Sequence, residues 1–326
     1  MAIPTIAMIP SSFKAGKLGS VLPLNGDGDF TFTRASSATR VNQSGLIEEV
    51  AANVPRLDYT GGGCPSLLLE PQQTQLYGET ATMATQTKTV TAVEHTVGFY
   101  GTGTITFTGV YSGSLVGTGT NDRVELTFTP TAGSLISTVS GSVTSSQLVT
   151  GAYLGSYIPN TTTGTITRIA DATSGSGNST VINSTQGVLY FEGSVLANPV
   201  SQEVALSVSE GQSGSNRLLI RVKTNGTIGI VLRVANTTQA SIDSGVLNQL
   251  ANHKVAVKWK LNDIALWIDG VEVGTESTAN VFPANTLDQV SFNQGNNSNP
   301  FIGKTKDLRV YTTALTDAEL TTLTTI

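Results

Sequence analysis

Tyrosine side chains are the residues of this chain best suited to hold a small polar ligand. A tyrosine ring offers a flat apolar face and a hydroxyl, and a ligand site of this kind needs only a few placed polar groups besides. Tyr100, Tyr111, Tyr153 and Tyr157 all fall in the middle of the chain. We predict Tyr100, Tyr111 and Tyr153 as carbohydrate-binding residues.

Asparagines supply the second candidate binding group. The stretch 293–299 holds four of them, and the amides of Asn296 and Asn297 are predicted to bind sugar hydroxyls or to coordinate calcium. A solvated loop without a ligand is the alternative. Trp259 and Trp267 lie in alternating stretches beside apolar partners, which indicates core positions rather than sugar platforms.

Acidic and nucleophilic residues do not form a convincing catalytic pattern, so no catalytic residue is predicted. Glycan hydrolysis needs two carboxylates facing one groove. Neighbouring pairs exist, but on a strand adjacent side chains point to opposite faces, and in a turn acids are expected anyway. These pairs are Asp27 with Asp29, Glu48 with Glu49, and Asp122 with Glu125. The two histidines, His95 and His253, stand near no nucleophile motif.

Metal and cofactor motifs are equally weak. Asp27 and Asp29 carry the oxygen ligands that calcium prefers, but no glutamate follows at the spacing of an EF-hand, so no metal site is predicted and these two remain weak calcium candidates. The single Cys64 excludes an internal disulfide and a cysteine-ligated zinc. No phosphate-binding loop is present, and no cofactor is predicted.

The composition excludes several classes of protein. Only 13% of the 326 residues are charged, about half the usual 25%, and 34 are glycine. Such a chain disfavours helical folds and favours strands and turns. With 18 basic residues spread singly and a net charge of −5, we expect no nucleic-acid partner. No apolar run reaches 18 residues, so we expect no membrane insertion. Residues 1–10 lack the basic start of a signal peptide, so we expect the protein to be made in the cytoplasm.

The elements that must position these residues are strands. We predict an all-β fold, with an irregular N-terminal segment over 1–76 that has too few apolar residues for a core of its own. Short alternating runs over 77–160 predict a β-sandwich, and 161–186 reads as a flexible Thr/Ser/Gly linker. Residues 187–326 predict a second, jelly-roll-like sandwich. The N-terminal segment should pack on the next domain or on another protein.

The C-terminal part carries the clearest local signals. Residues 254–260 alternate, with Val255, Val257 and Trp259 on one face, and Asp269-Gly270 predicts a tight hairpin turn. The stretch 316–319, Thr-Asp-Ala-Glu, matches a capping box and predicts one short C-terminal helix near 316–324.

These patterns resemble known families. Residues 187–326 resemble the laminin-G-like, concanavalin-A-like jelly roll, through the meander 255–270 and the ending 301–320. The stretches Phe30–Arg40, Pro55–Tyr59 and Leu67–Gln72 resemble a module common in structural proteins of tailed bacteriophages. The middle part resembles carbohydrate-binding-like sandwiches of phages that end in a motif of the type Ser156-Tyr-Ile-Pro159.

The resemblance implies a structural protein of the virion, of the fibre, spike or decoration type. It implies attachment to other virion proteins through the N-terminal segment, a homo-oligomer with a trimer favoured, and contact with host-surface glycan. A glycan depolymerase or lyase on a jelly-roll scaffold is the enzymatic alternative. A capsid-decoration protein without a ligand is the third hypothesis.

Overall fold

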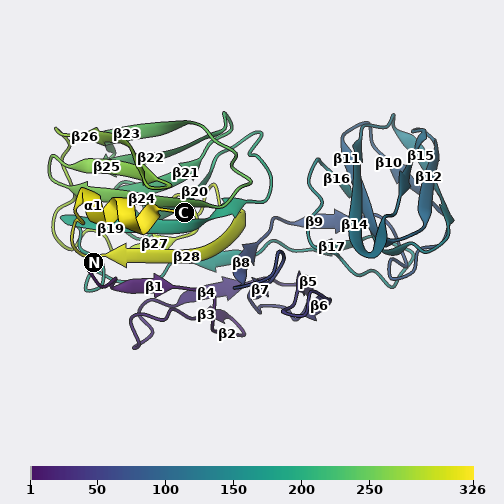
Figure 1. The fold of residues 1–326 in the computed structure, drawn as a ribbon, viewed down its shortest axis with the longest axis horizontal. Coiled ribbons are helices and arrows are strands. Elements are labelled where there is room, and N and C mark those ends of the chain that lie inside the picture. Colours follow the sequence, from purple (N-terminus) through teal and green to yellow (C-terminus); the bar gives the residue numbers. More distant parts are fainter. Residues whose placement is uncertain (1) are drawn as a thin grey trace.

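The computed structural model describes residues 2–326, which form two β-sandwich lobes and an N-terminal segment that lies along one of them (Figure 1). Strands dominate, and the one helix in this range is α1 (Asp317–Thr324). The all-β prediction with a single short C-terminal helix is therefore confirmed. No helix within 2–326 is long and apolar enough to cross a membrane.

The larger lobe contains an eight-stranded sheet. Its hydrogen-bonded order is β26-β25-β24-β19-β28-β8-β7, and β1 also pairs with β28. The alternation of residues 254–260 fits this sheet, because Val255, Val257 and Trp259 are all buried on its inner face. The strands are β1 (Ile6–Met8), β7 (Arg56–Asp58), β8 (Ser66–Leu69), β19 (Gln186–Val195), β24 (His253–Lys260), β25 (Ile264–Ile268), β26 (Val271–Glu276) and β28 (Gly303–Tyr311).

A five-stranded sheet closes the other side of this lobe, in the order β23-β22-β21-β20-β27. Side chains of both sheets share one core, in which Leu189 and Val257 of the first sheet lie with Leu206, Ile220 and Ile230 of the second. Its strands are β20 (Val204–Ser209), β21 (Arg217–Val222), β22 (Thr227–Val234), β23 (Thr237–Val246) and β27 (Gln289–Ser291).

The helix α1 covers the outer face of the eight-stranded sheet. Leu315, Leu320 and Leu323 pack on Tyr190 and Trp267 there. The predicted capping box is present, since the Thr316 hydroxyl accepts from the Glu319 N–H and the Glu319 carboxylate accepts from the Thr316 N–H. Trp267 is therefore a core residue, but of this outer cluster rather than of the space between the sheets.

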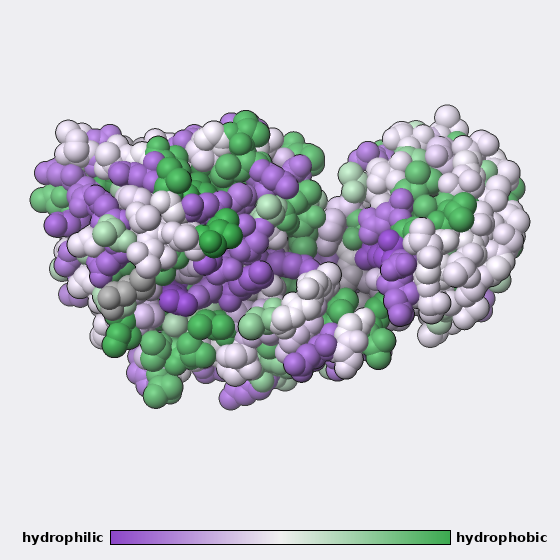
Figure 2. Space-filling model, in the orientation of Figure 1, coloured by the Kyte–Doolittle hydropathy of each residue, from purple (hydrophilic) through white to green (hydrophobic). Residues whose placement is uncertain are grey.

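The smaller lobe is a sandwich of two short sheets, ordered β10-β15-β12-β13 and β14-β11-β16. Between them lies a separate core that includes Tyr77, Phe99, Phe107 and Leu148. Figure 2 shows its visible face in pale colours of intermediate hydropathy. Its strands are β10 (Gln86–Val90), β11 (His95–Gly101), β12 (Thr104–Gly109), β13 (Gly113–Val116), β14 (Gly119–Phe128), β15 (Gly133–Ser140) and β16 (Thr144–Thr150).

The N-terminal segment is more ordered within its own chain than its composition indicated. Besides giving β1, β7 and β8 to the large sheet, it places Ile6, Phe30 and Phe32 in the core of the larger lobe. The segment was predicted to pack on the next domain, 77–160, or on another protein, and its apolar side chains instead enter the core of the larger, C-terminal lobe. Its further strands are β2 (Phe13–Lys14), β3 (Lys17–Leu18), β4 (Phe30–Thr33), β5 (Ala38–Val41), β6 (Ile47–Val50) and β9 (Gln73–Gln75).

The segment 161–186, predicted as a flexible linker, is instead paired and partly buried. Its strand β17 (Ile166–Arg168) pairs with β9, and β18 (Ala172–Ser174) pairs with β4. The Ser176 N–H donates to the Val290 carbonyl at 2.9 Å, and Ile182 lies in the core. Small polar residues are common both in linkers and in edge strands. Here they form strands because β9 and β4, which are remote in sequence, pair with them. Figure 1 shows β9 and β17 bridging the two lobes.

Candidate binding site at the junction of the lobes

Five charged side chains form a buried cluster where the lobes meet, which we call the ionic core: Arg34, Arg56, Glu70, Arg168 and Asp171. Their side chains are at most 1% exposed. Arg56 begins β7 and Arg168 ends β17, Arg34 and Glu70 directly follow β4 and β8, and Asp171 directly precedes β18. Three segments distant in sequence are thus held at one point.

Glu70 occupies the centre of the ionic core. Its carboxylate lies 2.5 Å from an Arg56 guanidinium nitrogen and 2.8 Å from one of Arg168. It also accepts from the Ser156 hydroxyl at 2.6 Å, the Ser156 N–H at 2.7 Å and the Tyr153 hydroxyl at 2.8 Å. With this many donors, the carboxylate is fully occupied by the protein itself.

Asp171 links Arg34, which follows β4, to Arg56 in β7. One oxygen accepts from Arg34 at 3.0 Å, and the other accepts from Arg56 and from the Glu70 N–H. Arg34 directs its remaining donors to backbone carbonyls of residues 36, 50, 51 and 54. The ionic core has three arginines and two carboxylates, and the backbone carbonyl groups around Arg34 stabilise the extra positive charge.

The electrostatics of the ionic core keep Glu70 charged. Burial alone would raise the pKa of Glu70, but the charges of Arg56 and Arg168 and the hydrogen bonds of Ser156 hold it well below its usual range. Burial would lower the pKa of Arg56, and Glu70 and Asp171 raise it above its ordinary value. Tyr153 has a raised pKa through burial and the nearby Glu70 charge, so its hydroxyl stays a donor.

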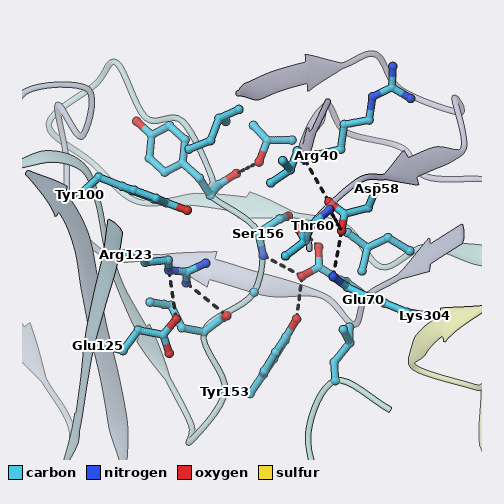
Figure 3. A pocket seen from close by; sticks show the side chains of 18 residues that line it. Arg40, Asp58, Thr60, Glu70, Tyr100, Arg123, Glu125, Tyr153, Ser156 and Lys304 are labelled. Atoms are coloured by element: carbon cyan, nitrogen blue, oxygen red, sulfur yellow. Dashed lines mark hydrogen bonds and ion pairs between the residues drawn. The ribbon is translucent and has the colours of Figure 1, made fainter. Parts of the chain in front are cut away.

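A pocket of about 330 Å³ opens beside the ionic core, and we call it the junction pocket (Figure 3). The β5–β6 hairpin, β7, β11, β14, the 153–157 segment and the edge of the larger lobe all line it. Leu68, Leu154 and Leu196 give it apolar surface, and the rings of Tyr100 and Tyr153 face it from the smaller lobe and from the connecting segment. Both lobes are needed to form it.

The charges around the junction pocket are paired. Arg123 lies 3.1 Å from Glu125, Lys304 lies 2.8 Å from Asp58, and Arg40 lies 3.2 Å from Glu48. Burial would raise the pKa of Asp58, but Lys304 lowers it below its usual value. Among the charged groups that line the pocket, Glu125 is the most exposed, at 46%.

Two of the predicted binding residues meet in this pocket and three do not. Tyr100 and Tyr153 both line it. The Tyr111 ring instead stacks on Phe128 at 4.3 Å between centroids, next to the core of the smaller lobe. Asn296 and Asn297 are exposed in the 293–299 loop of the larger lobe and do not line this pocket. Tyr157, a further ring considered from the sequence, also lines the pocket, and its hydroxyl shares a hydrogen bond of 2.7 Å with the Thr80 hydroxyl.

The weak calcium candidates are used within the protein. Asp29 pairs with Lys17 at 2.8 Å and accepts from the Ser20 N–H at 2.8 Å. Asp27 accepts from the Asn25 amide. Across the described residues 2–326, no group of three or more His, Cys, Asp or Glu side chains is placed to hold a metal ion.

Sequence reasoning missed the polar residues of the junction pocket. The smaller lobe supplies Arg123 and Glu125, and the large sheet supplies Asp58 and Lys304. The last two residues are 246 positions apart in the sequence. A signal was nevertheless present. In a chain with few charges, Arg34, Arg56 and Glu70 lie within the short motifs 30–40, 55–59 and 67–72 that stand out in the sequence. A charge placed next to buried strand residues indicates a buried pair.

The fold of the larger lobe defines the class of domain. Residues 194–321 match the family described as the concanavalin A-like lectin/glucanases superfamily, and they form a jelly roll of that kind. No curated protein matches the chain.

Several solved structures are similar over part of the chain. The carbohydrate-binding module CBM40 of the Ruminococcus gnavus IT-sialidase, bound to α2,3-sialyllactose, is 22% identical with a TM-score of 0.39 and covers 47% of this chain and 93% of its own. A leech intramolecular trans-sialidase is 22% identical with a TM-score of 0.39, covering 47% and 26%. A heptameric SAP-like pentraxin from Limulus polyphemus is 17% identical with a TM-score of 0.34, covering 43% and 70%.

Proposed function

We propose that this protein is a non-enzymatic structural protein of a tailed-phage virion, of the fibre, spike or decoration type, that binds host-surface glycan. One observation carries the proposal. The motifs that resemble the phage module supply Arg34, Arg56 and Glu70, and the motif that ends the middle module supplies Ser156. Together these residues join the two β-sandwiches through buried ion pairs and hydrogen bonds. A rigid connection of this kind suits a virion protein that carries mechanical load between particle and host.

Glycan binding is supported by the lectin-like jelly roll and by the tyrosines of the junction pocket. The non-enzymatic character is supported by the state of the buried acids. A catalytic acid needs access to substrate and a pKa near the working pH. Glu70 is saturated by donors and has a pKa far below that range.

Attachment to other virion proteins is assigned to the N-terminal segment, in a homo-oligomer with a trimer favoured. Large apolar side chains remain exposed on this segment after it has packed on its own lobes, among them Ile9, Phe13, Val21 and Leu24. Figure 2 shows green side chains gathered along the lower edge of the molecule, where this segment lies in Figure 1. Such a strip is suited to a protein–protein contact.

The test is the position of the protein on intact particles. Antibody labelling of purified virions should mark a fixed structure, and mass spectrometry of the same particles should find the protein in stoichiometric amount. Absence from purified particles would contradict the virion assignment. Incubation with host-surface polysaccharide tests the enzymatic alternative, because release of defined oligosaccharides would show a depolymerase.

A further inference from the structure

The junction pocket combines three features that suit a small ligand. It has a volume of about 330 Å³, an aromatic wall and ionised groups within reach of its opening. Small-molecule sites are concave, largely apolar and supplied with a few oriented polar groups, and their volumes start at about 300 Å³. This size suits a monosaccharide or disaccharide unit rather than a long chain lying across a surface.

The Tyr100 side chain is free to serve a ligand. Its ring lies along the wall formed by the smaller lobe, as Figure 3 shows, and its hydroxyl makes no hydrogen bond within the described part of the chain. By contrast, the Tyr153 hydroxyl is committed to Glu70 at 2.8 Å. Tyr100 can therefore offer both a stacking face and a hydroxyl, while Tyr153 offers only its ring.

The ionised groups are arranged for hydroxyls rather than for a charge. Each of the three lining cations already has a carboxylate partner: Arg40 pairs with Glu48, Arg123 with Glu125 and Lys304 with Asp58. Arg123 is held in place by Glu125 and by its donation to the Leu154 carbonyl at 3.2 Å. An acidic sugar would need a cation without a partner, and it would meet the Glu125 carboxylate instead.

We infer that the junction pocket binds a neutral sugar unit of the glycan, with Tyr100 as the stacking platform and Glu125 and Arg123 as the acceptor and donor for its hydroxyls. This inference rests on the proposed glycan binding and assigns it to a site between the lobes, outside the core of the jelly roll. Because both lobes line the pocket, a bound sugar contacts both of them.

The experiment measures binding of the full chain to an array of neutral hexose and hexosamine oligosaccharides and to the same oligosaccharides capped with a sialic or uronic acid. The expected result is binding to members of the neutral set, with the acidic cap giving no gain. Tyr100→Ala and Glu125→Gln should each weaken this binding about tenfold or more. Tyr59→Ala is the control, because Tyr59 is also half-buried but does not line the pocket.

Each outcome decides between the two proposals. If the wild type binds and both variants, Tyr100→Ala and Glu125→Gln, bind equally well and unfold at the same temperature, this result would place the glycan elsewhere. It would overturn this inference, while the proposed function stands. A preference for acid-capped sugars would overturn the assignment of a neutral unit. Failure of the wild type to bind either set would overturn this inference and the glycan part of the proposed function, and particle labelling would still test the virion part.

Discussion

Glu70 is the residue on which the junction depends most, because two guanidinium groups share its carboxylate. A buried ion pair adds little over an apolar replacement of both partners, but removing one partner leaves an uncompensated charge in a dry environment. The ionic core is therefore easily damaged by single substitutions, even though its net contribution to stability is modest. The same reasoning applies to Asp171, which bridges Arg34 and Arg56.

Glu70→Gln should lower the free energy of unfolding by about 3–5 kcal/mol, because Arg56 and Arg168 lose their shared counter-charge. Urea denaturation followed by fluorescence measures the change. Glu48→Gln is the matched control, since Glu48 pairs with Arg40 at the surface and is 44% exposed. It should change stability by less than about 1 kcal/mol. Equal losses for the two variants would contradict the role of burial.

The pH dependence of stability follows from the direction of the Glu70 pKa shift. The folded-state pKa lies below that of the unfolded chain, about 4.3, so the stabilisation is complete above that pH and is lost as the pH falls towards the folded-state pKa. Urea denaturation between pH 7 and pH 3 should show this decline. Glu70→Gln should flatten it in part, because Asp58 has a lowered pKa for a similar reason and remains. A slope identical to that of the wild type would show that Glu70 does not contribute.

The segment 153–157 is the element that closes the ionic core against the junction pocket. Gly155 permits this, because a Cβ atom there would lie 2.7 Å from the Gln73 side-chain oxygen, 2.8 Å from that of Glu70 and 2.9 Å from an Arg168 nitrogen. Those side chains are buried and mutually bonded, so they have little room to yield.

Gly155→Ala should therefore destabilise the protein by about 1–3 kcal/mol, the usual cost of forcing an extra methyl group into packed surroundings. Thermal and urea unfolding measure the loss. Gly164→Ala serves as the control, because Gly164 is exposed and the nearest atom to its added Cβ is 3.8 Å away. A Gly155→Ala variant as stable as the control would mean that the segment can shift away from the core.

Elements with local signals were predictable, and elements with remote partners were not. The alternation of 254–260 and the capping box at Thr316 specify a strand and a helix through neighbours in the sequence. The strands β1 and β8 are short and uniformly buried, so they show no alternation, and their partner β28 lies near the other end of the chain. The binding role of Tyr100 and Tyr153 stays a prediction. The pocket that both residues line could not be predicted, because Arg123 and Lys304, which also line it, are remote in sequence.

At the scale of the whole molecule, the two lobes have separate cores joined by the ionic core and by the β9–β17 pair. Because the two cores are separate, the lobes unfold together only if the contacts at the junction couple them. The wild type should show one calorimetric transition, because opening either lobe exposes the same buried charges.

The double variant Glu70→Gln with Asp171→Asn should separate this into two transitions, since the coupling between the lobes is weakened while their apolar cores remain intact. Differential scanning calorimetry makes the comparison, with Glu48→Gln again as the control. Two transitions already present in the wild type would show that the junction does not couple the lobes.

The pairing of β1 and β8 with β28 has a consequence for how the chain is made. Ribosomes add about 5–20 residues per second, so β1 and β8 wait roughly 12–60 s for β28, which is made much later. During that time the smaller lobe can fold, whereas the edges of β1 and β8 stay open. We therefore expect nascent chains stalled before Gly303 to engage chaperones and to aggregate, and release of the full-length chain to end that exposure.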